Sequence, residues 1–260
     1  MLKILKYSFF DLIRSRWSYV YLIFYFLLSV VLLFLNPSLS KAILTLMNVI
    51  ILLVPLIGTI FGVMYYYNSK EFTELLLALP IKRSSIFLGQ FFGVAISLSL
   101  SLILGLGIPF IIYGLFDSNA IWEFSLLIIL GTFLSFIFSG ISYYIALSNE
   151  NRIKGFGFAI LVWLFMAVIY DGIFLIALNM FSDYPLDKFA LIASLSNPID
   201  LSRVMMLLKL DISALLGYTG ALFKKFFGSN TGSIIAFFIL IIWTIFPVLA
   251  LKIKSAKKDF

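Results

Sequence analysis

Hydrophobic residues follow one another along this chain in long stretches, with few polar residues among them. Six stretches of 19 or more residues contain a single charged residue between them, Asp171. They cover residues 17–35, 42–67, 86–116, 124–147, 155–180 and 231–251. About 20 apolar residues cross a bilayer core as a helix, whereas membrane-barrel strands are alternating segments of about 10 residues. The pattern therefore predicts six membrane-spanning helices.

Composition agrees with this pattern. Of the 260 residues, 63% are hydrophobic and 12% are charged, whereas soluble domains have about 45–50% apolar and about 25% charged residues. A soluble fold could not build a water-facing shell from so few polar residues. We therefore expect an all-α membrane protein in which residues 1–260 form one six-helix transmembrane domain.

The positions of the basic residues predict the orientation. If the N-terminus lies inside the cell, 13 of the 19 Lys and Arg residues fall in cytoplasmic segments, and five of the other six lie in one long external loop, 181–230. Basic residues are enriched in short cytoplasmic segments. The net charge of +7 is therefore a signal of topology, with both termini cytoplasmic, and we expect no nucleic acid partner.

Two short cytoplasmic segments have helical patterns of their own. In residues 1–16, five apolar residues fall near one face (Ile4, Leu5, Phe9, Leu12 and Ile13), which predicts a helix in the membrane interface or a simple charged anchor. Between the second and third spans, Phe72, Leu75, Leu76 and Leu79 form one apolar stripe, and Pro80 ends the pattern. This helix, over about 69–79, is either a stable turn or a docking element for a cytoplasmic partner.

The external loop 181–230 is long enough to fold. Asn197 followed by Pro198 is a helix start, with Asp200 in the first turn, and Asp211 or Ser213 is a second start. We expect a helical cap at the outer face. It is either an interfacial helical hairpin or a platform that binds a partner.

Two further features concern the spans themselves. Asp171 lies within the fifth span, where a charge is costly, so it is either a gate residue on a permeation path or a hydrogen-bonding residue that fixes the span to a neighbour. Gly58 with Gly62, and Gly89 with Gly93, have the spacing that lets helices approach closely. They indicate packing within the bundle or at a dimer interface.

Several kinds of chemistry are excluded by residues that the chain lacks. It contains no G-x-x-x-x-G-K-[ST] motif, and it has neither His nor Cys. ATP binding by a P-loop, Ser-His-Asp catalysis and zinc sites are therefore excluded. The scattered Met residues are more typical of gap-filling side chains than of copper ligands. We expect no enzyme activity, no bound cofactor and no metal site in this chain.

Particular segments resemble a known family. The stretch 71–90, EFTELLLALPIKRSSIFLGQ, is similar to the coupling-helix motif of ABC-2-type transporter permeases. The stretch 197–221, NPIDLSRVMMLLKLDISALLGYTGA, together with Tyr170-Asp171, is similar to NosY-like permeases of that class, which serve nitrous-oxide reductase maturation. The resemblance covers essentially the whole chain.

The resemblance implies an ABC-2 permease fold in a bacterial inner membrane, and it implies partners and site residues. The expected partners are a cytoplasmic ABC ATPase dimer that carries ATP and Mg, a second copy of this chain, a periplasmic copper-handling protein and the lipid bilayer. By resemblance, ATPase coupling falls on Glu71, Phe72, Glu74, Leu75, Leu79, Lys82 and Arg83. The gate candidates are Tyr170 and Asp171. The expected contacts with the periplasmic partner are Asn197, Pro198, Asp200, Arg203, Asp211 and Tyr218.

Other functions compete with this one. An ABC-2 permease of the same shape could export a lipid, a peptide or a polysaccharide. A stand-alone channel or secondary transporter would work without an ATPase. A membrane enzyme would need a polar cluster that the sequence does not indicate.

Overall fold

The computed structural model of the chain describes residues 1–36, 38–181, 187–210, 223–224, 226 and 230–257. Within these residues the fold is all-α, with six helices long and apolar enough to cross a membrane. The spans are α2 (Arg16–Leu35), α3 (Leu39–Asn68), α5 (Arg83–Ile112), α6 (Ile121–Ser148), the combined α7–α8, and α12 (Asn230–Lys257). The six predicted spans are confirmed.

The third span is shorter at its C-terminal end than the predicted run 86–116. Helix α5 ends at Ile112, and Gly114 then adopts a left-handed conformation with φ of 92°. Glycine reaches this conformation without the steric penalty of a side chain. The remaining apolar residues form the short turn η1 (Leu115–Asp117), so hydrophobicity alone placed this boundary four residues too late.

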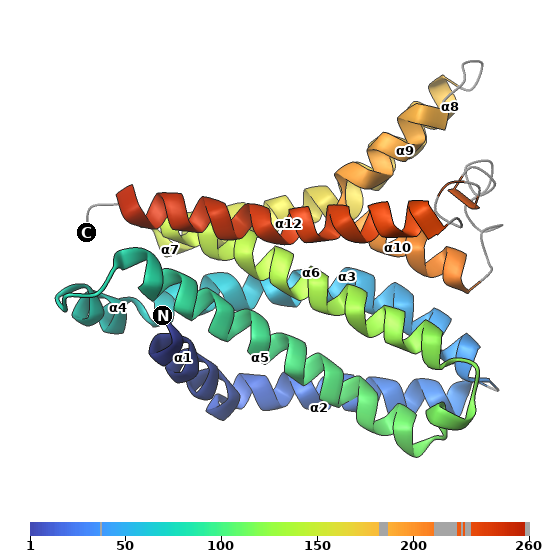
Figure 1. Cartoon of the computed structure of the whole chain (residues 1–260), viewed down its shortest axis with the longest axis horizontal. Coiled ribbons are helices and arrows are strands. Elements are labelled where there is room, and N and C mark those ends of the chain that lie inside the picture. The colour runs from blue at the N-terminus through green and yellow to red at the C-terminus, as the bar shows by residue number, and fades with distance from the viewer. Residues whose placement is uncertain (37, 182–186, 211–222, 225, 227–229, 258–260) are drawn as a thin grey trace.

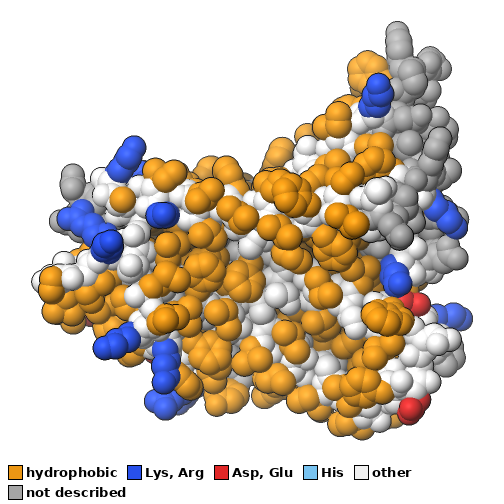
Figure 2. Space-filling view, in the orientation of Figure 1, with side chains coloured by type: hydrophobic (Ala, Val, Ile, Leu, Met, Phe, Trp, Pro, Cys, Tyr) orange, Lys and Arg blue, Asp and Glu red, His pale blue; other side chains and the backbone are white. Residues whose placement is uncertain are grey.

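The spans lie side by side in a bundle whose two ends differ (Figure 1). The N-terminus and the C-terminal end of α12 lie at one end, together with the short helix α4 (Lys70–Leu77). Figure 2 shows Lys and Arg side chains gathered at this end, which we call the basic end, and hydrophobic side chains over the middle of the molecule. Other Lys and Arg side chains lie at the opposite end, where acidic side chains are also in view. The α2–α3 and α5–α6 connections lie at the opposite end. This distribution is that of an integral membrane protein.

Helices α3, α5 and α6 form the centre of the bundle. In their most apolar windows, 50–56% of the residues are buried, compared with 11% in the fifth span. A Cβ added at Gly62 on α3 would lie 2.1 Å from Ser142 Oγ and 2.7 Å from the Ser139 carbonyl on α6. Gly89 and Gly93 similarly lie against α1 (Leu2–Arg14). Both glycine pairs therefore serve packing within the chain, the first of the two roles that the sequence left open.

The predicted N-terminal helix is present as α1. Ile4 and Leu12 are buried, and Leu5, Phe9 and Ile13 are half-buried, so the predicted apolar face is confirmed. This face packs on α5, where Gly89 and Gly93 lie under Ile4 and Ser8. The N-terminal segment is therefore a helix that packs against α5.

The fifth span is irregular. It consists of α7 (Arg152–Leu164), a π-helical turn η2 (Phe165–Ile169) and α8 (Tyr170–Met180). Figure 1 shows α8 leaving the bundle, with α9 (Asp187–Ser196) beside it. A π turn inserts one extra residue into a helix and often marks a functional position.

Helices α9 and α10 (Pro198–Lys209) form a hairpin bent by 114°. The Asn197 side chain accepts a hydrogen bond from the Ile199 N–H, and Pro198 is the first helical residue, so the predicted helix start is confirmed. Trp243 on α12 donates to the Leu195 carbonyl at 3.4 Å. Because Trp243 lies about 18 Å along α12 from Thr231 at 1.5 Å per residue, the bend reaches the middle of the bundle. The second predicted helix start, at Asp211 or Ser213, lies outside the described residues.

Candidate functional site

The first candidate site is helix α4 at the basic end. Leu75 and Leu79 are 71% and 51% exposed, and Glu71 and Glu74 are exposed beside them. Lys70 and Glu74 form an ion pair at 3.9 Å. The helix ends at Leu77, two residues before the end of the predicted stretch 69–79, so Leu79 lies in the turn that follows it. Together α4 and this turn present two leucines and two carboxylates to their surroundings.

The single apolar stripe predicted for this helix is divided between two faces in the structure. Phe72 and Leu76 are half-buried, whereas Leu75 and Leu79 point outward. The residue at the centre of the inward face is Thr73, which is 5% exposed. The hydrogen bonds of Thr73 fix the rotation of α4 about its own axis. Because Thr73 is turned inward, the apolar residues of the predicted stripe do not all lie on the buried face.

A chain of buried hydrogen bonds connects α4 to the centre of the bundle. Thr73 donates to the Ser69 carbonyl at 2.8 Å, and Gln90 Nε2 on α5 donates to Thr73 Oγ1 at 2.8 Å. Tyr143 on α6 donates to Gln90 Oε1. Gln90 and Tyr143 are both 0% exposed. A buried amide in a membrane bundle needs such partners, so this Thr73–Gln90–Tyr143 chain ties α4 to two central helices.

The other predicted coupling residues lie at the turn after α4. Lys82 is the N-cap residue of α5 and Arg83 is its first residue, and both are exposed. Phe72 stacks on Tyr7 of α1 with ring centroids 4.5 Å apart. All seven predicted coupling residues thus lie at the basic end, six of them exposed to solvent and Phe72 engaged with α1.

The second candidate site lies where α8 meets α10. Arg203 forms ion pairs with Asp171 and, at 3.2 Å, with Asp200. The Asp171 and Arg203 side chains are 28% and 31% exposed. The acid within the fifth span therefore has a cationic partner 32 residues further along the chain.

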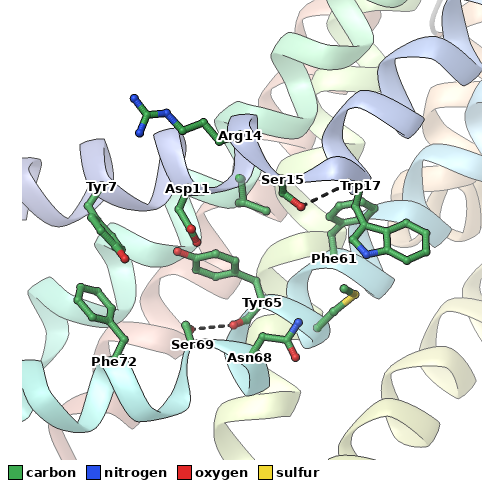
Figure 3. Close-up of a pocket in the computed structure, with 12 residues that line it drawn as sticks. Tyr7, Asp11, Arg14, Ser15, Trp17, Phe61, Tyr65, Asn68, Ser69 and Phe72 are labelled. Atoms are coloured by element: carbon green, nitrogen blue, oxygen red, sulfur yellow. Dashed lines mark hydrogen bonds between the residues drawn. The ribbon is translucent and has the colours of Figure 1, made fainter.

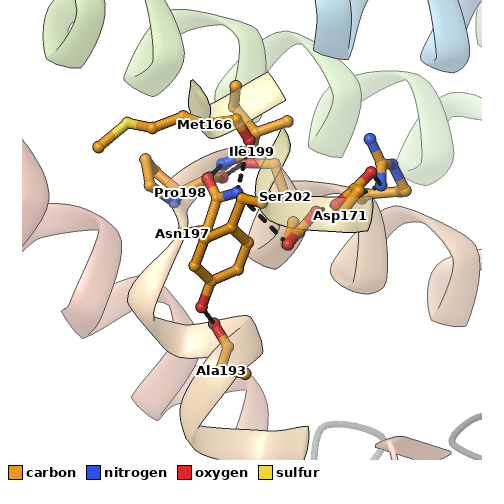
Figure 4. Close-up of polar contacts among 10 residues, drawn as sticks. Met166, Asp171, Ala193, Asn197, Pro198, Ile199 and Ser202 are labelled. Atoms are coloured by element: carbon orange, nitrogen blue, oxygen red, sulfur yellow. Dashed lines mark hydrogen bonds and ion pairs between the residues drawn. The ribbon is translucent and has the colours of Figure 1, made fainter. Parts of the chain in front are cut away.

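Asn197 and Tyr170 complete this second cluster (Figure 4). Asn197 Nδ2 donates to the Met166 carbonyl at 2.7 Å and to Asp200 at 3.3 Å. Met166 belongs to the π turn η2, and Tyr170 donates to the Ala193 carbonyl on α9 at 2.8 Å. The two gate candidates and four of the six residues assigned to a periplasmic partner thus come together in one region.

The burial of this cluster limits what it can contact. Asn197 is 1% exposed, and Pro198 and Asp200 are also buried. In the structure these side chains join the α9–α10 hairpin to the fifth span. Contact with a partner stays a prediction for them, and Asp211 and Tyr218 lie outside the described residues.

Two contacts of these sites cannot be read from the sequence. Gln90 stands in the motif 71–90, but its partners Thr73 and Tyr143 are 17 and 53 residues away from it. Arg203 belongs to the predicted external loop, apart from Asp171 in the fifth span. The sequence offers one signal for the second contact. An unpaired charge within a span is costly, so Asp171 needs a cationic partner, but the sequence does not identify that partner.

The fold defines the class of this protein as an integral membrane protein with six spanning helices. No protein-family model matches the chain. The chain is 25% identical over 226 residues to the probable ABC transporter permease protein NosY of Stutzerimonas stutzeri, in a match that covers 81% of this chain and 78% of that protein. This similarity supports an ABC transporter permease subunit.

Proposed function

We propose that this chain is the permease subunit of an ATP-driven ABC transporter and that α4 docks on an ATPase subunit. The observation that carries the proposal is the outer face of α4 and of the turn after it, where exposed Leu75 and Leu79 lie beside Glu71 and Glu74. Exposed apolar residues flanked by charges are typical of a surface that binds a partner. ATP and Mg would be held by that ATPase, in keeping with the absence of a P-loop motif in this chain.

The buried face of α4 supports a mechanical role. A displacement of α4 by the ATPase would pull on Thr73, and through it on Gln90 and Tyr143, which lie 2.8 Å or less from their partners. Hydrogen bonds restrict relative movement because they require narrow distances and angles. Motion of α4 would therefore be passed to α5 and α6 together, and along them to the opposite end of the bundle.

The opposite end would be the outer side of a bacterial inner membrane, with both termini cytoplasmic. This orientation is supported by the basic residues that gather at the end with the termini (Figure 2). The α9–α10 hairpin would move with the fifth span, since Arg203 joins it to Asp171. The exposed fifth span, with 11% of its apolar window buried, suits contact with a second copy of this chain.

The finer proposal concerns the reaction served. On the resemblance of residues 197–221 to NosY-like permeases, the transporter would support copper-site maturation of nitrous-oxide reductase, with a periplasmic copper-handling protein bound at the outer end. Among the described residues, no group of three or more His, Cys, Asp or Glu could hold a metal ion. This chain would therefore transmit motion, or conduct a copper or sulfur species, without storing metal.

The proposal is tested by the proteins that co-purify with the tagged full chain in a mild detergent. We expect an ABC ATPase in an amount about equal to that of the permease, together with a second permease copy. A periplasmic copper-handling protein in the same complex would support the finer proposal, and an export partner for lipid, peptide or polysaccharide would replace it. A fully active chain that purifies without an ATPase would be a channel and would contradict the proposal.

A further inference from the structure

A cavity of about 440 Å³ lies at the basic end, between α1, the start of α2, the end of α3 and α4 (Figure 3). Its volume falls within the range of about 300–1,000 Å³ that is common for small-ligand sites. It is lined by five aromatic residues, namely Tyr7, Trp17, Phe61, Tyr65 and Phe72. An aromatic lining of this kind attracts cations, because the face of each ring is electronegative.

Two charged residues line this cavity, Asp11 and Arg14, and the Asp11 carboxylate is the one directed into it (Figure 3). Figure 3 shows Asp11 directed toward Tyr65, whereas the neighbouring Arg14 extends away on the other side of α1. Asp11 forms no ion pair with any described residue. A carboxylate among aromatic rings, without a cation of its own, completes a site for a positively charged group.

Tyr65 adds a hydrogen-bonding group to the wall. It is 7% exposed, and its hydroxyl lies close to Ser8 and Asp11 without a well-formed hydrogen bond to either. Asn68 offers an amide oxygen at the edge of the cavity. Acceptors beside a carboxylate favour a cation with N–H donors, so a primary ammonium suits the site better than a quaternary one.

The depth of the cavity indicates where such a group would come from. Trp17 is the second residue of the first span, and tryptophan is enriched at the level of lipid headgroups. Tyr65 lies three residues before the end of α3, about 5 Å along the helix axis. Helix α1 carries Lys3 and Lys6 beside its apolar face, as interfacial helices do. The cavity therefore lies at headgroup level.

From these observations we infer that the cavity binds the ethanolamine headgroup of a membrane phospholipid, with its ammonium held by Asp11 inside the aromatic lining. The acyl chains would extend along the spans, which are apolar at this level. Such a lipid would brace α1 against α4, because Tyr7 and Phe72 form both the wall of the cavity and the stacked contact between these helices. This inference does not depend on the proposed transport function.

The test measures the melting temperature of the purified full chain in detergent micelles. Dihexanoyl phosphatidylethanolamine, phosphatidylcholine and phosphatidylglycerol have the same acyl chains and differ in the headgroup. We expect phosphatidylethanolamine to raise Tm by roughly 5–10 °C at a concentration 100 times its Kd. The other two lipids should give clearly smaller shifts.

Three variants locate the effect. Asp11→Asn should remove the excess shift, whereas Asp117→Asn, an exposed acid at the opposite end, should keep it. Tyr65→Phe, which retains the ring, should reduce the difference between phosphatidylethanolamine and phosphatidylcholine. Because Asp11 is exposed, its variant should melt at the wild-type temperature without lipid.

Other results would overturn the inference. Equal shifts from all three lipids, or an unchanged shift in Asp11→Asn, would mean that the headgroup is not recognised here. An equal shift from free O-phosphoethanolamine would mean that the site takes a soluble amine. If Asp11→Asn instead prevents co-purification of an ATPase while the lipid shifts are absent, the occupant is a cationic side chain of that partner. The lipid shifts of the wild-type chain and of Asp11→Asn can be measured and interpreted whether or not the chain is a transporter.

Discussion

Gln90 carries a primary amide into the centre of a membrane bundle and is 0% exposed. Both ends of the amide are used, since Nε2 donates to Thr73 and Oε1 accepts from Tyr143. Residues Ile86 to Leu88, which precede it in the same motif, are apolar. The sequence shows a polar residue within a span, but its purpose becomes visible only when α4 and α6 are placed beside it.

Replacing Gln90 with Leu should weaken the link between α4 and the bundle. Two hydrogen bonds are lost, and the buried Tyr143 hydroxyl loses its acceptor, whereas Thr73 keeps its bond to the Ser69 carbonyl. We expect this change to cost about 1–3 kcal/mol. ATPase activity of the purified complex should then respond less to the permease. The matched control is Ser99→Ala on the same helix, whose hydroxyl bonds only to Ala95 of its own turn.

The same link can be tested from its other end. Thr73→Val removes the hydroxyl, so its ATPase coupling should fall as in Gln90→Leu. Thr73→Ser retains the hydroxyl, so its coupling should equal that of the wild type. Equal coupling in all of these variants would show that the hydrogen bonds are structural and transmit nothing.

Asp171 is the residue for which the sequence allowed two roles, and its ion pair with Arg203 favours the fixing of one helix to another. Asp171→Leu should destabilise the chain by about 1.5–3 kcal/mol, because Arg203 then retains only Asp200. Thermal unfolding measures this loss. The double variant Asp171→Leu with Arg203→Leu should lose less than the sum of the two single variants. Additive losses would argue against the pair.

At the scale of the elements, the sequence predicted the spans, α1, α4 and the start of α10. These elements depend on local signals, namely apolar length, one-sided periodicity and the Asn197-Pro198 cap. The sequence did not predict the π turn η2, the outward direction of Leu75 and Leu79, or the bend between α9 and α10. Those features depend on contacts such as Thr73 with Gln90 and Asn197 with Met166, whose partners are distant in sequence.

Close packing of α3 on α6 gives a prediction about glycine. Gly62→Ala should destabilise the bundle by about 1–3 kcal/mol, because the new methyl group meets the Ser139 carbonyl at 2.7 Å. Gly107→Ala on α5 is the matched control, since nothing lies within 4 Å of its Cβ position. Thermal unfolding of both variants measures the difference. Similar melting temperatures would contradict the close approach of α3 and α6.

At the scale of the whole molecule, Lys and Arg side chains gather at the end that holds α4, and hydrophobic side chains cover the middle (Figure 2). It contains no Cys, so a single introduced thiol reports its own side of the membrane. A membrane-impermeant thiol reagent should label Asn119→Cys on intact cells and Ala78→Cys only after lysis. Both positions are exposed, at opposite ends of the bundle. The reverse labelling would place the termini outside.

The central claim is that α4 docks an ATPase through Glu71, Glu74 and Leu75. The measurement that tests it most directly is the amount of ATPase retained by tagged Glu71→Lys/Glu74→Lys permease, compared with Asp117→Lys/Glu150→Lys, which makes the same change in net charge at other exposed positions. We predict that the first variant folds normally and loses the ATPase, whereas the second retains it. Full retention of the ATPase by the first variant would contradict the account.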